Sequence, residues 1–581
     1  MQPVDFTTLA ALAADLRSHW LPARVEQVYQ RDRYTIAIAL RTIDQRGWLT
    51  VSWHPQAARV CIDEAPPRDP NTFAFNQQLR HQLSGLALSS IEAIAPWERV
   101  LDFQFTRRPG DPALWHLYIE VMGKYSNVVL ATADQQIVTV AHQVSAQQSS
   151  VRPLLTGQPY EVPPALREAA PSLEESLERW RDRLALVPIP LKRALLQNYR
   201  GLSSALVLSM CQTAHVDANA TTDTLLADDW ERLFHHWRQW LTALGNETFE
   251  PAWTTDGYTV LGWNSTATVD SVQTVVGQYY RDRLNQQEFG QLKHQISQRL
   301  VNVLKKLYIK LNDFQSRLDQ SDSADRLKDQ ADLLMAHLHL WEPGMTRITL
   351  EDFATGDPVA IALNPEKNAV QNAQALYKKH QKLRRSRQAL EPLLQETQSE
   401  IDYLEQVQVA LAQLGEYTSP DDLEALDEIR EELEEQQYLT TSEQSSRSRT
   451  ATNFRRYTTP GGLEIWVGRN NHQNDELTFR LATDYDLWFH SQEIPGSHVL
   501  LRLQPGHPAE EADLQFTADV AAFHSRAVQS EQVPVIYTEP RHVYKPKGAK
   551  PGMVIYKQER VIWGQPQRFA GDRQLASPLS S

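Results

Sequence analysis

The sequence predicts a multi-domain α+β protein whose globular modules flank a long antiparallel coiled-coil hairpin. At 581 residues, with 41% hydrophobic side chains, the chain is too long for one ordinary core and apolar enough to form several. Stretches that alternate apolar and polar residues, typical of half-buried strands, gather toward both ends. Between them, two long segments repeat apolar residues at spacings of three and four, which is typical of a coiled-coil seam.

Residues 1–170 are predicted to form a sandwich-type α+β domain. An amphipathic helix is expected over 7–19, and antiparallel strands follow it. Four of these strands are expected at 34–40, 48–53, 100–105 and 114–120. The domain is expected to close on the proline- and glycine-rich stretch 153–164, because such residues interrupt regular structure.

Residues 171–282 are predicted to form a helical module that then returns to the N-terminal domain. Gly201, Leu202 and Ser203 interrupt two helices, which permits a helix-hairpin-helix arrangement. Such a hairpin can direct backbone N–H groups at a phosphate, although two helices joined at a glycine are also an ordinary packing turn. Both interpretations stay open at this point.

A coiled-coil hairpin is predicted over 283–436. Its first seam runs from Phe289 to Leu318 and its second from Leu376 to Leu414, with a β-like connection over 346–363 between them. Two seams in one chain favour an antiparallel hairpin. Pairing between two copies of the chain is the alternative that the pattern leaves open.

The chain after the hairpin is predicted to contain one more domain. Residues 437–455 are polar and lack apolar periodicity, so they are expected to be a linker. Residues 456–570 are predicted to form an α/β domain with a helix over 514–530. A disordered tail is expected over 571–581.

The charge of the chain is acidic overall but unevenly distributed. The formal net charge is −14, whereas phosphate contacts need lysine and arginine. Acidic side chains crowd into 421–435. A basic run comprises Lys378, Lys379, Lys382, Arg384, Arg385 and Arg387. Local basic patches therefore keep RNA binding possible, although such a run can also be a solvated helix face.

The cysteine content and the N-terminus favour a soluble cytoplasmic protein. Only Cys61 and Cys211 occur, which suits a reducing compartment and leaves no basis for a disulfide framework or a cysteine-based zinc site. The first five residues, Met1 to Asp5, have no basic segment before an apolar core. We therefore expect neither secretion nor membrane insertion.

Polar and aromatic residues are densest near the C-terminus. Gly468–Leu477 is rich in Asn, and Asp486–His490 and Pro495–Val499 follow it. These groups suit the recognition of phosphates, sugars or base edges, and Trp488 and Phe489 are able to stack on bases. The alternative is an Asn- and Gly-rich turn whose aromatic residues belong to the core.

The same region contains residue types that bind metals or catalyse hydrolysis. These are His472, Asp475, Asp486, His490 and His498. Their spacing matches no common ligand pattern, and no nucleophile–base pair is evident. We therefore predict no metal, no cofactor and no catalytic residue.

Two further motifs lie in the N-terminal region. Glu98-Arg99 precedes an expected strand, and Glu120–Asn127 ends another strand in a turn that contains glycine. Alone, a surface ion pair and a tight turn explain them.

Taken together, the motifs resemble the NFACT family of ribosome-associated quality-control factors, RqcH type, whose older members were labelled fibronectin-binding proteins. The resemblance covers about 1–570. It is carried by Asp5, Glu98-Arg99, Glu120–Asn127, Arg152–Gly157, Tyr160, Pro163, Pro164, Leu363–Pro365, Asn372–Gln374, Lys378-Lys379, Gly468–Asn471, Asn474-Asp475, Trp488–His490, Pro495–His498 and Lys545–Gly552. Many ordered matches make the resemblance specific.

The resemblance implies a glycosylase-like sandwich at 1–170, a helix-hairpin-helix module at 171–282 and an NFACT-R RNA-binding domain at 456–570. Glycosylase chemistry does not carry over. Those repair enzymes are recognised by Pro-Glu directly after Met1 and by a zinc finger. Here Gln2-Pro3-Val4 stands at that place, and two cysteines cannot build the finger.

The function that the resemblance implies is not enzymatic. Family members bind a large ribosomal subunit that still holds peptidyl-tRNA, recruit alanyl-tRNA, and direct an untemplated alanine tail that marks the stalled chain for degradation. Peptide bonds would form in the ribosome's own centre, while the protein supplies proximity. The implied partners are this subunit, its rRNA and alanyl-tRNA, with no DNA and no membrane.

The resemblance also implies three sets of binding residues. For tRNA they are Asp5, Glu98, Arg99, Glu120, Val121, Met122 and Lys124. For RNA in the C-terminal domain they are Arg469, Asn470, Asn471, Asn474, Trp488, His490, His498, Lys545 and Lys547. For rRNA on the coiled coil they are Lys378, Lys379, Lys382, Arg384 and Arg385. The family usually has Asp where this chain has Glu98, which moves the carboxylate by roughly 1 Å.

Two other functions compete with this interpretation. An RNA- or DNA-processing enzyme would use the C-terminal His and Asp residues, and a metal-dependent nuclease assay would detect it. An extracellular fibronectin-binding adhesin is the third hypothesis, against which the first residues argue and which cell fractionation would test.

Overall fold

The computed structural model describes residues 1–66, 73–145, 147–149, 152–164, 168–321, 324–440 and 454–573. The chain forms two compact units, Met1–Gln286 and Gln287–Ser581. No helix in the described ranges is both long and apolar enough to cross a membrane. The multi-domain α+β architecture predicted from the sequence is confirmed.

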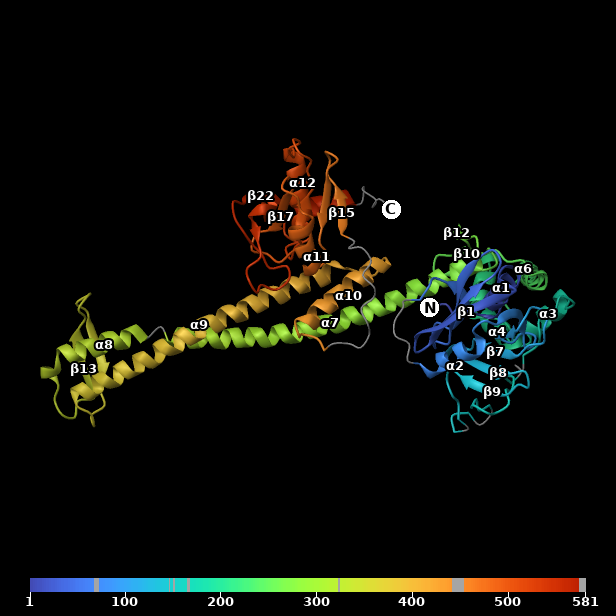
Figure 1. Ribbon diagram of the computed structural model, residues 1–581, viewed down its shortest axis with the longest axis horizontal. Helices are drawn as coiled ribbons and strands as arrows, with labels where there is room; N and C mark the ends of the chain where they lie inside the picture. Colours follow the sequence, from blue (N-terminus) through green and yellow to red (C-terminus); the bar gives the residue numbers. More distant parts are fainter. Residues whose placement is uncertain are drawn as a thin grey trace. The chain divides into compact units, whose positions relative to one another are not determined.

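The first unit is built on one antiparallel sheet of nine strands, in the order β4-β3-β2-β1-β5-β6-β7-β8-β9 (Figure 1). The strands are β1 (Ala23–Asp32), β2 (Thr35–Arg41), β3 (Arg46–Ser52), β4 (Arg59–Asp63), β5 (Ala87–Ala93), β6 (Val100–Thr106), β7 (Trp115–Glu120), β8 (Asn127–Thr132) and β9 (Ile137–Val140). Two helices accompany them, α1 (Phe6–Trp20) and α2 (Ala74–Leu83).

The expected sandwich of separate sheets is replaced by this single sheet. Only two residue pairs, Ala23 with Leu88 and Arg24 with Ala87, join β1 to β5. The strands on either side of this junction nevertheless line the same apolar core, which includes Ile38 and Phe103. Alternation along a strand specifies its buried face, but it does not specify which strands share hydrogen bonds.

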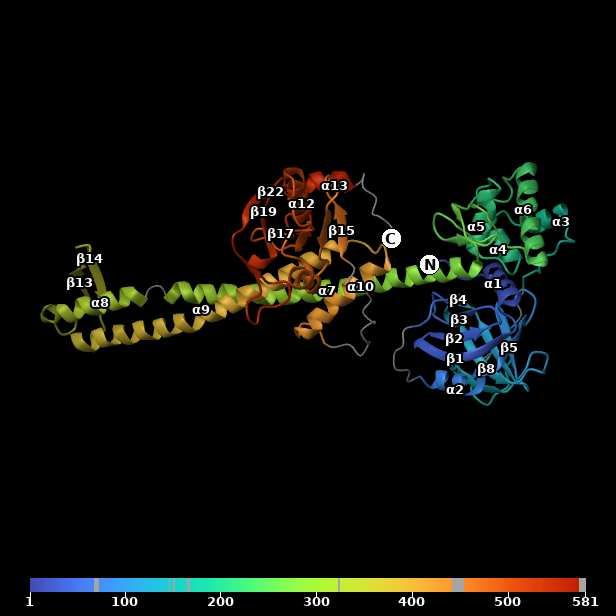
Figure 2. The ribbon, with the colours of Figure 1, turned by 45° about the horizontal axis from the view of Figure 1, so that its top comes forward.

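A helical module follows the sheet and lies on the other side of α1 from it (Figure 2). Its helices are α3 (Leu177–Ala185), α4 (Leu191–Asn198), α5 (Ser204–Thr213) and α6 (Ala227–Asn246). Trp180, Trp230, Trp237 and Trp240 fill its core. The short strands β10 (Ala252–Trp253), β11 (Tyr258–Thr259) and β12 (Ala267–Thr268) then lead to α7 (Val272–Ser321), whose first turns return to the N-terminal core.

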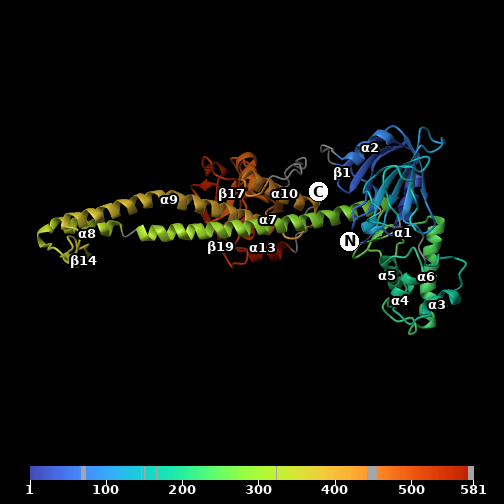
Figure 3. The same ribbon diagram turned by 90° about the horizontal axis from the view of Figure 1, so that it is seen from below.

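The second unit contains an antiparallel helical pair, α7 and α9 (Ala369–Gln413), which lie side by side (Figure 3). Phe289 meets Tyr417 just beyond the end of α9, with ring centroids 6.0 Å apart, while Tyr308 further along α7 hydrogen-bonds the earlier residue Glu405. The seam residues Leu300, Leu304, Ile401, Leu404 and Leu411 share one apolar cluster. In the described ranges, the seams therefore pair within one chain.

Further elements complete the hairpin. Between α7 and α9 lie α8 (Ala324–Ala336), β13 (Arg347–Glu351) and β14 (Pro358–Ala362), the last two paired as the expected β connection. After α9 comes α10 (Pro420–Glu435), the helix of the acidic stretch. Its Leu423, Leu426, Ile429 and Leu433 join the seam cluster.

The C-terminal domain contains a six-stranded antiparallel sheet, in the order β15-β16-β18-β17-β19-β22. Its elements are β15 (Arg455–Thr458), β16 (Glu464–Val467), α11 (Asn471–Glu476), η3 (Leu477–Leu481), β17 (Leu487–Ser491), β18 (Val499–Leu501), α12 (Glu511–Phe523), β19 (Val533–Thr538), β20 (Val543–Tyr544), β21 (Ile555–Tyr556), β22 (Arg560–Gly564) and α13 (Pro566–Arg573).

Three boundaries near the C-terminus need comment. The helix expected over 514–530 is α12, which begins at Glu511 and ends at Phe523. Of the expected linker, 441–453 lie outside the described residues, and Arg455 already belongs to β15. Of the expected tail, 571–573 belong to α13, and 574–581 lie outside the described residues.

Candidate nucleic-acid interface

The two N-terminal motifs lie side by side. Strands β6 and β7 pair Val100 with Glu120, and the backbone N–H of Val121 donates to the carbonyl of Arg99 at 2.9 Å. Arg99 and Met122 are half-buried, and Lys124 is exposed. The guanidinium of Arg99 has no hydrogen bond or ion pair with any described residue. It is therefore available to an external anion.

Glu120 is engaged inside the protein rather than exposed to a ligand. Its side chain is 2% exposed and forms a bidentate ion pair with Arg152, with Nη2···Oε1 2.5 Å and Nη1···Oε2 3.1 Å. The phenol of Tyr160 donates to Oε1 of Glu120 at 2.9 Å. Burial and then the negative charge of Glu120 raise the pKa of Tyr160 well above its ordinary value, so the phenol stays a donor.

The prediction that Glu120, Val121 and Asp5 contact tRNA is therefore corrected to a supporting role. Val121 is buried beside Glu120. Asp5 caps α1 by accepting from the N–H of Thr8 at 2.8 Å, and its other oxygen accepts from Ser203 Oγ at 2.5 Å. Both carboxylate oxygens are used, so Asp5 ties the N-terminus to the helical module.

The Asp5–Ser203 contact also bears on the proposed phosphate-binding hairpin. Ser203 is the N-cap of α5 and accepts from the N–H of Leu206 at 3.0 Å. The carboxylate of Asp5 meets Ser203 at this same helix terminus. A negative charge from the protein therefore already lies where a phosphate would bind, which favours the ordinary packing turn.

Trp97 holds the Glu98-Arg99 pair in an unusual backbone conformation. Its φ of +68° is in the left-handed region, which is rare for a bulky residue. The Trp97 ring packs against Phe6 at 4.9 Å and Trp240 at 5.6 Å between centroids. A Cβ added to Gly201 would lie 2.5 Å from this ring. Sequence patterns did not indicate Trp97, because left-handed backbone in a tryptophan leaves no periodic signal.

Glu98 directly follows Trp97 and is half-buried. Its Oε1 is buried and has no hydrogen-bond partner among the described residues. An unpaired buried acceptor is costly, and such groups gather at functional sites.

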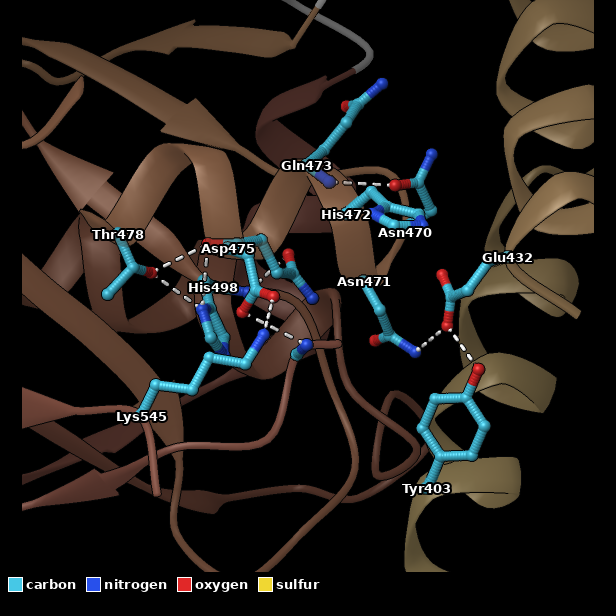
Figure 4. A network of polar contacts seen from close by, with 12 residues as sticks. Tyr403, Glu432, Asn470, Asn471, His472, Gln473, Asp475, Thr478, His498 and Lys545 are labelled. Atoms are coloured by element: carbon cyan, nitrogen blue, oxygen red, sulfur yellow. Dashed lines mark hydrogen bonds and ion pairs between the residues drawn. The ribbon is translucent and has the colours of Figure 1, made fainter. Parts of the chain in front are cut away.

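The Asn-rich C-terminal block docks onto the helical hairpin (Figure 4). Asn471 Nδ2 donates to Glu432 Oε1 on α10 at 3.0 Å, and the phenol of Tyr403 on α9 donates to the same oxygen at 2.7 Å. Gln473 Nε2 donates to Glu428 Oε2 at 2.9 Å, and Asn470 donates to the same carboxylate. Burial raises the pKa of Glu432 above its ordinary value.

The residues behind α11 form a second buried network. The N–H of His498 donates to Asn474 Oδ1 at 3.0 Å, and Trp488 Nε1 donates to Thr478 Oγ1 at 3.1 Å. The Trp488 ring stacks on His490, with centroids 5.7 Å apart. These five side chains are buried, so they support the sheet and do not present a stacking surface.

The prediction that this block contacts RNA directly is therefore corrected for most of its members. The buried residues are Asn470, Asn471, Asn474, Trp488, His490 and His498. Arg469 is also largely covered, with Nη1 3.8 Å from Asp422 on α10. The alternative interpretation, a structural turn with aromatics in the core, describes them better. Residue types suited to RNA recognition are equally suited to a buried hydrogen-bond network.

Lys545 and Lys547 are the members of this set that reach solvent. Lys545 pairs with Asp475, whose Oδ1 also accepts from the N–H of Gly552 at 3.1 Å. Lys550 lies over the rings of Tyr403 and Tyr438 at 4.6 and 4.5 Å. The basic loop is therefore attached at two points and presents its remaining cations outward.

The basic run lies on α9 and is exposed. Lys378, Lys379, Lys382, Arg384 and Arg385 have no ion pair with a described residue, whereas Arg387 pairs with Glu391 at 2.8 Å. Five cations without counter-ions suit a polyanion.

The predicted metal-binding types do not converge. In the described part of the chain, no three His, Cys, Asp or Glu side chains are arranged to hold a metal ion. His472 lies 3.5 Å from Glu435, and Asp486 caps local backbone by accepting from the N–H of Thr483 at 2.8 Å.

The two buried histidines make the C-terminal domain sensitive to acid. Burial lowers the pKa of His490 to about 4 and that of His498 to about 3, whereas unfolded imidazoles titrate near 6.5. Their stabilising effect is therefore complete above pH 6.5 and declines as the pH falls toward 4, because the unfolded state binds the protons first. Urea unfolding, followed by hydrogen exchange of residues 487–501, should give roughly 2 kcal/mol less stability per histidine at pH 5.0 than at pH 7.5. His490→Gln should flatten this dependence, and an unchanged slope would contradict the assignment.

Comparison with known proteins places these features in one class, multi-domain proteins with a dedicated RNA-binding domain. The family model of the NFACT N-terminal and middle domains matches residues 5–452, and that of the NFACT protein RNA binding domain matches 453–558. The chain belongs to the NFACT family of ribosome quality-control factors.

Individual relatives span nearly the whole chain. The Rqc2 homolog RqcH of Bacillus subtilis is 30% identical over 566 residues, which is 95% of this chain and 96% of that protein. The Rqc2 homolog RqcH of Streptococcus suis is 29% identical over similar shares, 95% and 96%. A solved C-terminal part of the fibronectin/fibrinogen-binding protein from Streptococcus suis is 30% identical and covers 49% of this chain and 98% of its own, with a TM-score of 0.38.

Proposed function

We propose that this protein binds separated large ribosomal subunits that hold peptidyl-tRNA, recruits alanyl-tRNA, and directs untemplated alanine addition to the stalled chain. The observation that carries the proposal is the unpaired guanidinium of Arg99, held against the turn that begins at Val121. The extended match to RqcH proteins and the RNA-binding domain support it.

The chemistry assigned to this chain is positioning. Holding a tRNA at a reactive centre turns a bimolecular encounter into a local one, which requires no nucleophile in the protein. Burial raises the pKa of both Cys61 and Cys211 to about 12, so neither thiol is a ready nucleophile. The peptidyl transferase centre of the ribosome would form the bonds.

Arg99→Ala is expected to remove co-purifying tRNA and alanine tailing while it leaves the melting temperature and large-subunit binding unchanged. A specific guanidinium contact to RNA is worth about 1–3 kcal/mol, or roughly 5- to 150-fold in affinity. Arg107→Ala is the matched control, because Arg107 is exposed just beyond the far end of the same strand. If Arg99→Ala retains tRNA at the wild-type level, the assigned reading surface is wrong.

The basic run is proposed to bind rRNA. Changing Lys378, Lys379 and Lys382 together to Gln should reduce sedimentation with free large subunits and make binding less dependent on salt, because each lost phosphate contact lowers the salt slope by about 0.7–0.9. Arg317→Gln on α7 is the control, since Arg317 is paired with Asp313 at 2.9 Å. Unchanged sedimentation of the triple variant, or equal occupancy of intact ribosomes by the wild type, would count against this site.

A further inference from the structure

The 3-10 turn after β7 presents an unusually exposed aromatic ring. Tyr125, the last residue of this turn (η1, Gly123–Tyr125), is 72% exposed, more than any other aromatic side chain in the described residues. Lys124 Nζ lies 4.9 Å from its ring centroid. Exposing a large aromatic surface to water is unfavourable, so such a residue suggests a partner.

The turn that carries Tyr125 is held rigidly. Ser126 Oγ donates to the carbonyl of Gly123 at 2.7 Å and accepts from the N–H of Met122 at 2.8 Å. Asn127 is buried and bridges to both backbone groups of His142, at 2.7 and 3.0 Å. Gly123 takes a left-handed φ of +59°, which suits glycine. A preorganised ring loses little conformational freedom when it stacks on a ligand.

A small pocket adjoins the same turn. Val121 and Gly123 line one side, and Met1, Pro3, Val4, Pro55, Gln56 and Ala58 line the rest of a volume of about 270 Å³. This is just below the usual range for ligand pockets, roughly 300–1,000 Å³, and suits one planar ring system. Gln56 is exposed, and its amide can both donate and accept hydrogen bonds.

Phosphate-binding groups are placed beside the turn. Arg99, whose carbonyl accepts from Val121, has an unpaired guanidinium, and Lys124 is exposed. Stacking ring, small mixed pocket and nearby cations together match how proteins hold unpaired bases of single-stranded RNA. A base within a duplex is already stacked and cannot enter.

We propose that the turn 121–125 and the adjoining pocket bind unstacked nucleobases of a single-stranded RNA loop, with one base stacked on Tyr125 and a neighbouring base read by Gln56. This site rests on the tRNA-reading role proposed above and names the part of the RNA that is recognised. It predicts selection of loops over helices and a preference among loop bases.

The test uses the full-length protein and two labelled probes, an RNA hairpin with a seven-base loop and a blunt RNA duplex of equal length, with affinities measured by fluorescence anisotropy. Tyr125→Ala should weaken hairpin binding on the order of 5- to 150-fold and leave duplex binding within twofold. Tyr125→Phe should rescue hairpin binding because it keeps the ring. Ile43→Ala is the control, since Ile43 is 98% exposed in the turn between β2 and β3.

The pocket is tested with hairpins that differ at single loop positions. Gln56→Ala should reduce discrimination between loop bases at one position by several-fold. Equal weakening for every loop sequence would show that Gln56 does not read a base and would overturn this part.

Outcomes for Tyr125 separate this site from the proposed function. If Tyr125→Ala binds the hairpin normally while Arg99→Ala does not, the stacking site is wrong and the tRNA-reading role stands. If neither change affects the hairpin, both are wrong. Equal losses for hairpin and duplex with Tyr125→Ala would indicate a backbone-binding patch and overturn the stacking site.

Discussion

Arg152→Ala is expected to destabilise the first unit by about 3–5 kcal/mol, because it leaves the buried carboxylate of Glu120 without its cationic partner. Tyr160 would be the only remaining hydrogen-bond donor to that carboxylate among the described residues. Denaturant unfolding of the purified protein measures the loss. The double variant Glu120→Gln, Arg152→Met should recover much of it, since no buried charge is then left unpaired.

The same experiment distinguishes two roles for Glu120. If Glu120 supports the turn, Arg152→Ala and Glu120→Ala should both lower the unfolding free energy, and tRNA binding should weaken as a consequence. If Glu120 instead contacts tRNA directly, Glu120→Ala should lose tRNA at unchanged stability, and the supporting role would be wrong.

Gly201→Ala is expected to have the second large effect, on stability and on tRNA binding together. Gly201 has a φ of +79°, which costs an alanine about 1–2 kcal/mol, and the new Cβ would lie 2.5 Å from the ring of Trp97. Trp97 must then move, and Glu98 and Arg99 follow it in the chain. We expect tRNA affinity to fall about tenfold or more, because misplaced groups lose positioned contacts.

A matched control exists within the helical module. Gly245 lies in α6 with open space around its Cα, so Gly245→Ala should be neutral or stabilising by up to about 1 kcal/mol. Melting temperature and co-purifying tRNA are measured for both variants. A Gly201→Ala protein with wild-type values of both would show that Trp97 does not position Arg99.

The NFACT membership and the helical hairpin were predictable because their signals are local. Apolar spacing of three and four depends only on helix geometry, and residues such as Leu304 and Leu404 do lie in one cluster. The sequence did not indicate that α10 adds a third apolar face to this cluster, because its acidic residues dominate the composition.

The roles of the polar motifs were less predictable. Asn471 and His498 are residue types that read RNA and also residue types that satisfy buried networks, and only their partners distinguish the two. Those partners, Glu432 and Asn474, come from different parts of the chain, 39 and 24 residues away. The conclusion that most of this block is structural therefore needed the coordinates.

By itself the sequence determined the α+β class, the family and the residues that form each motif, since these depend on composition, periodicity and order along the chain. The tertiary structure alone decided which of those residues remain free to bind. Glu120 is neutralised by Arg152 from 32 residues away, whereas Arg99 keeps an unpaired guanidinium. Burial and pairing are properties of neighbours in space, and a long-range contact leaves no local periodic pattern in the chain that forms it.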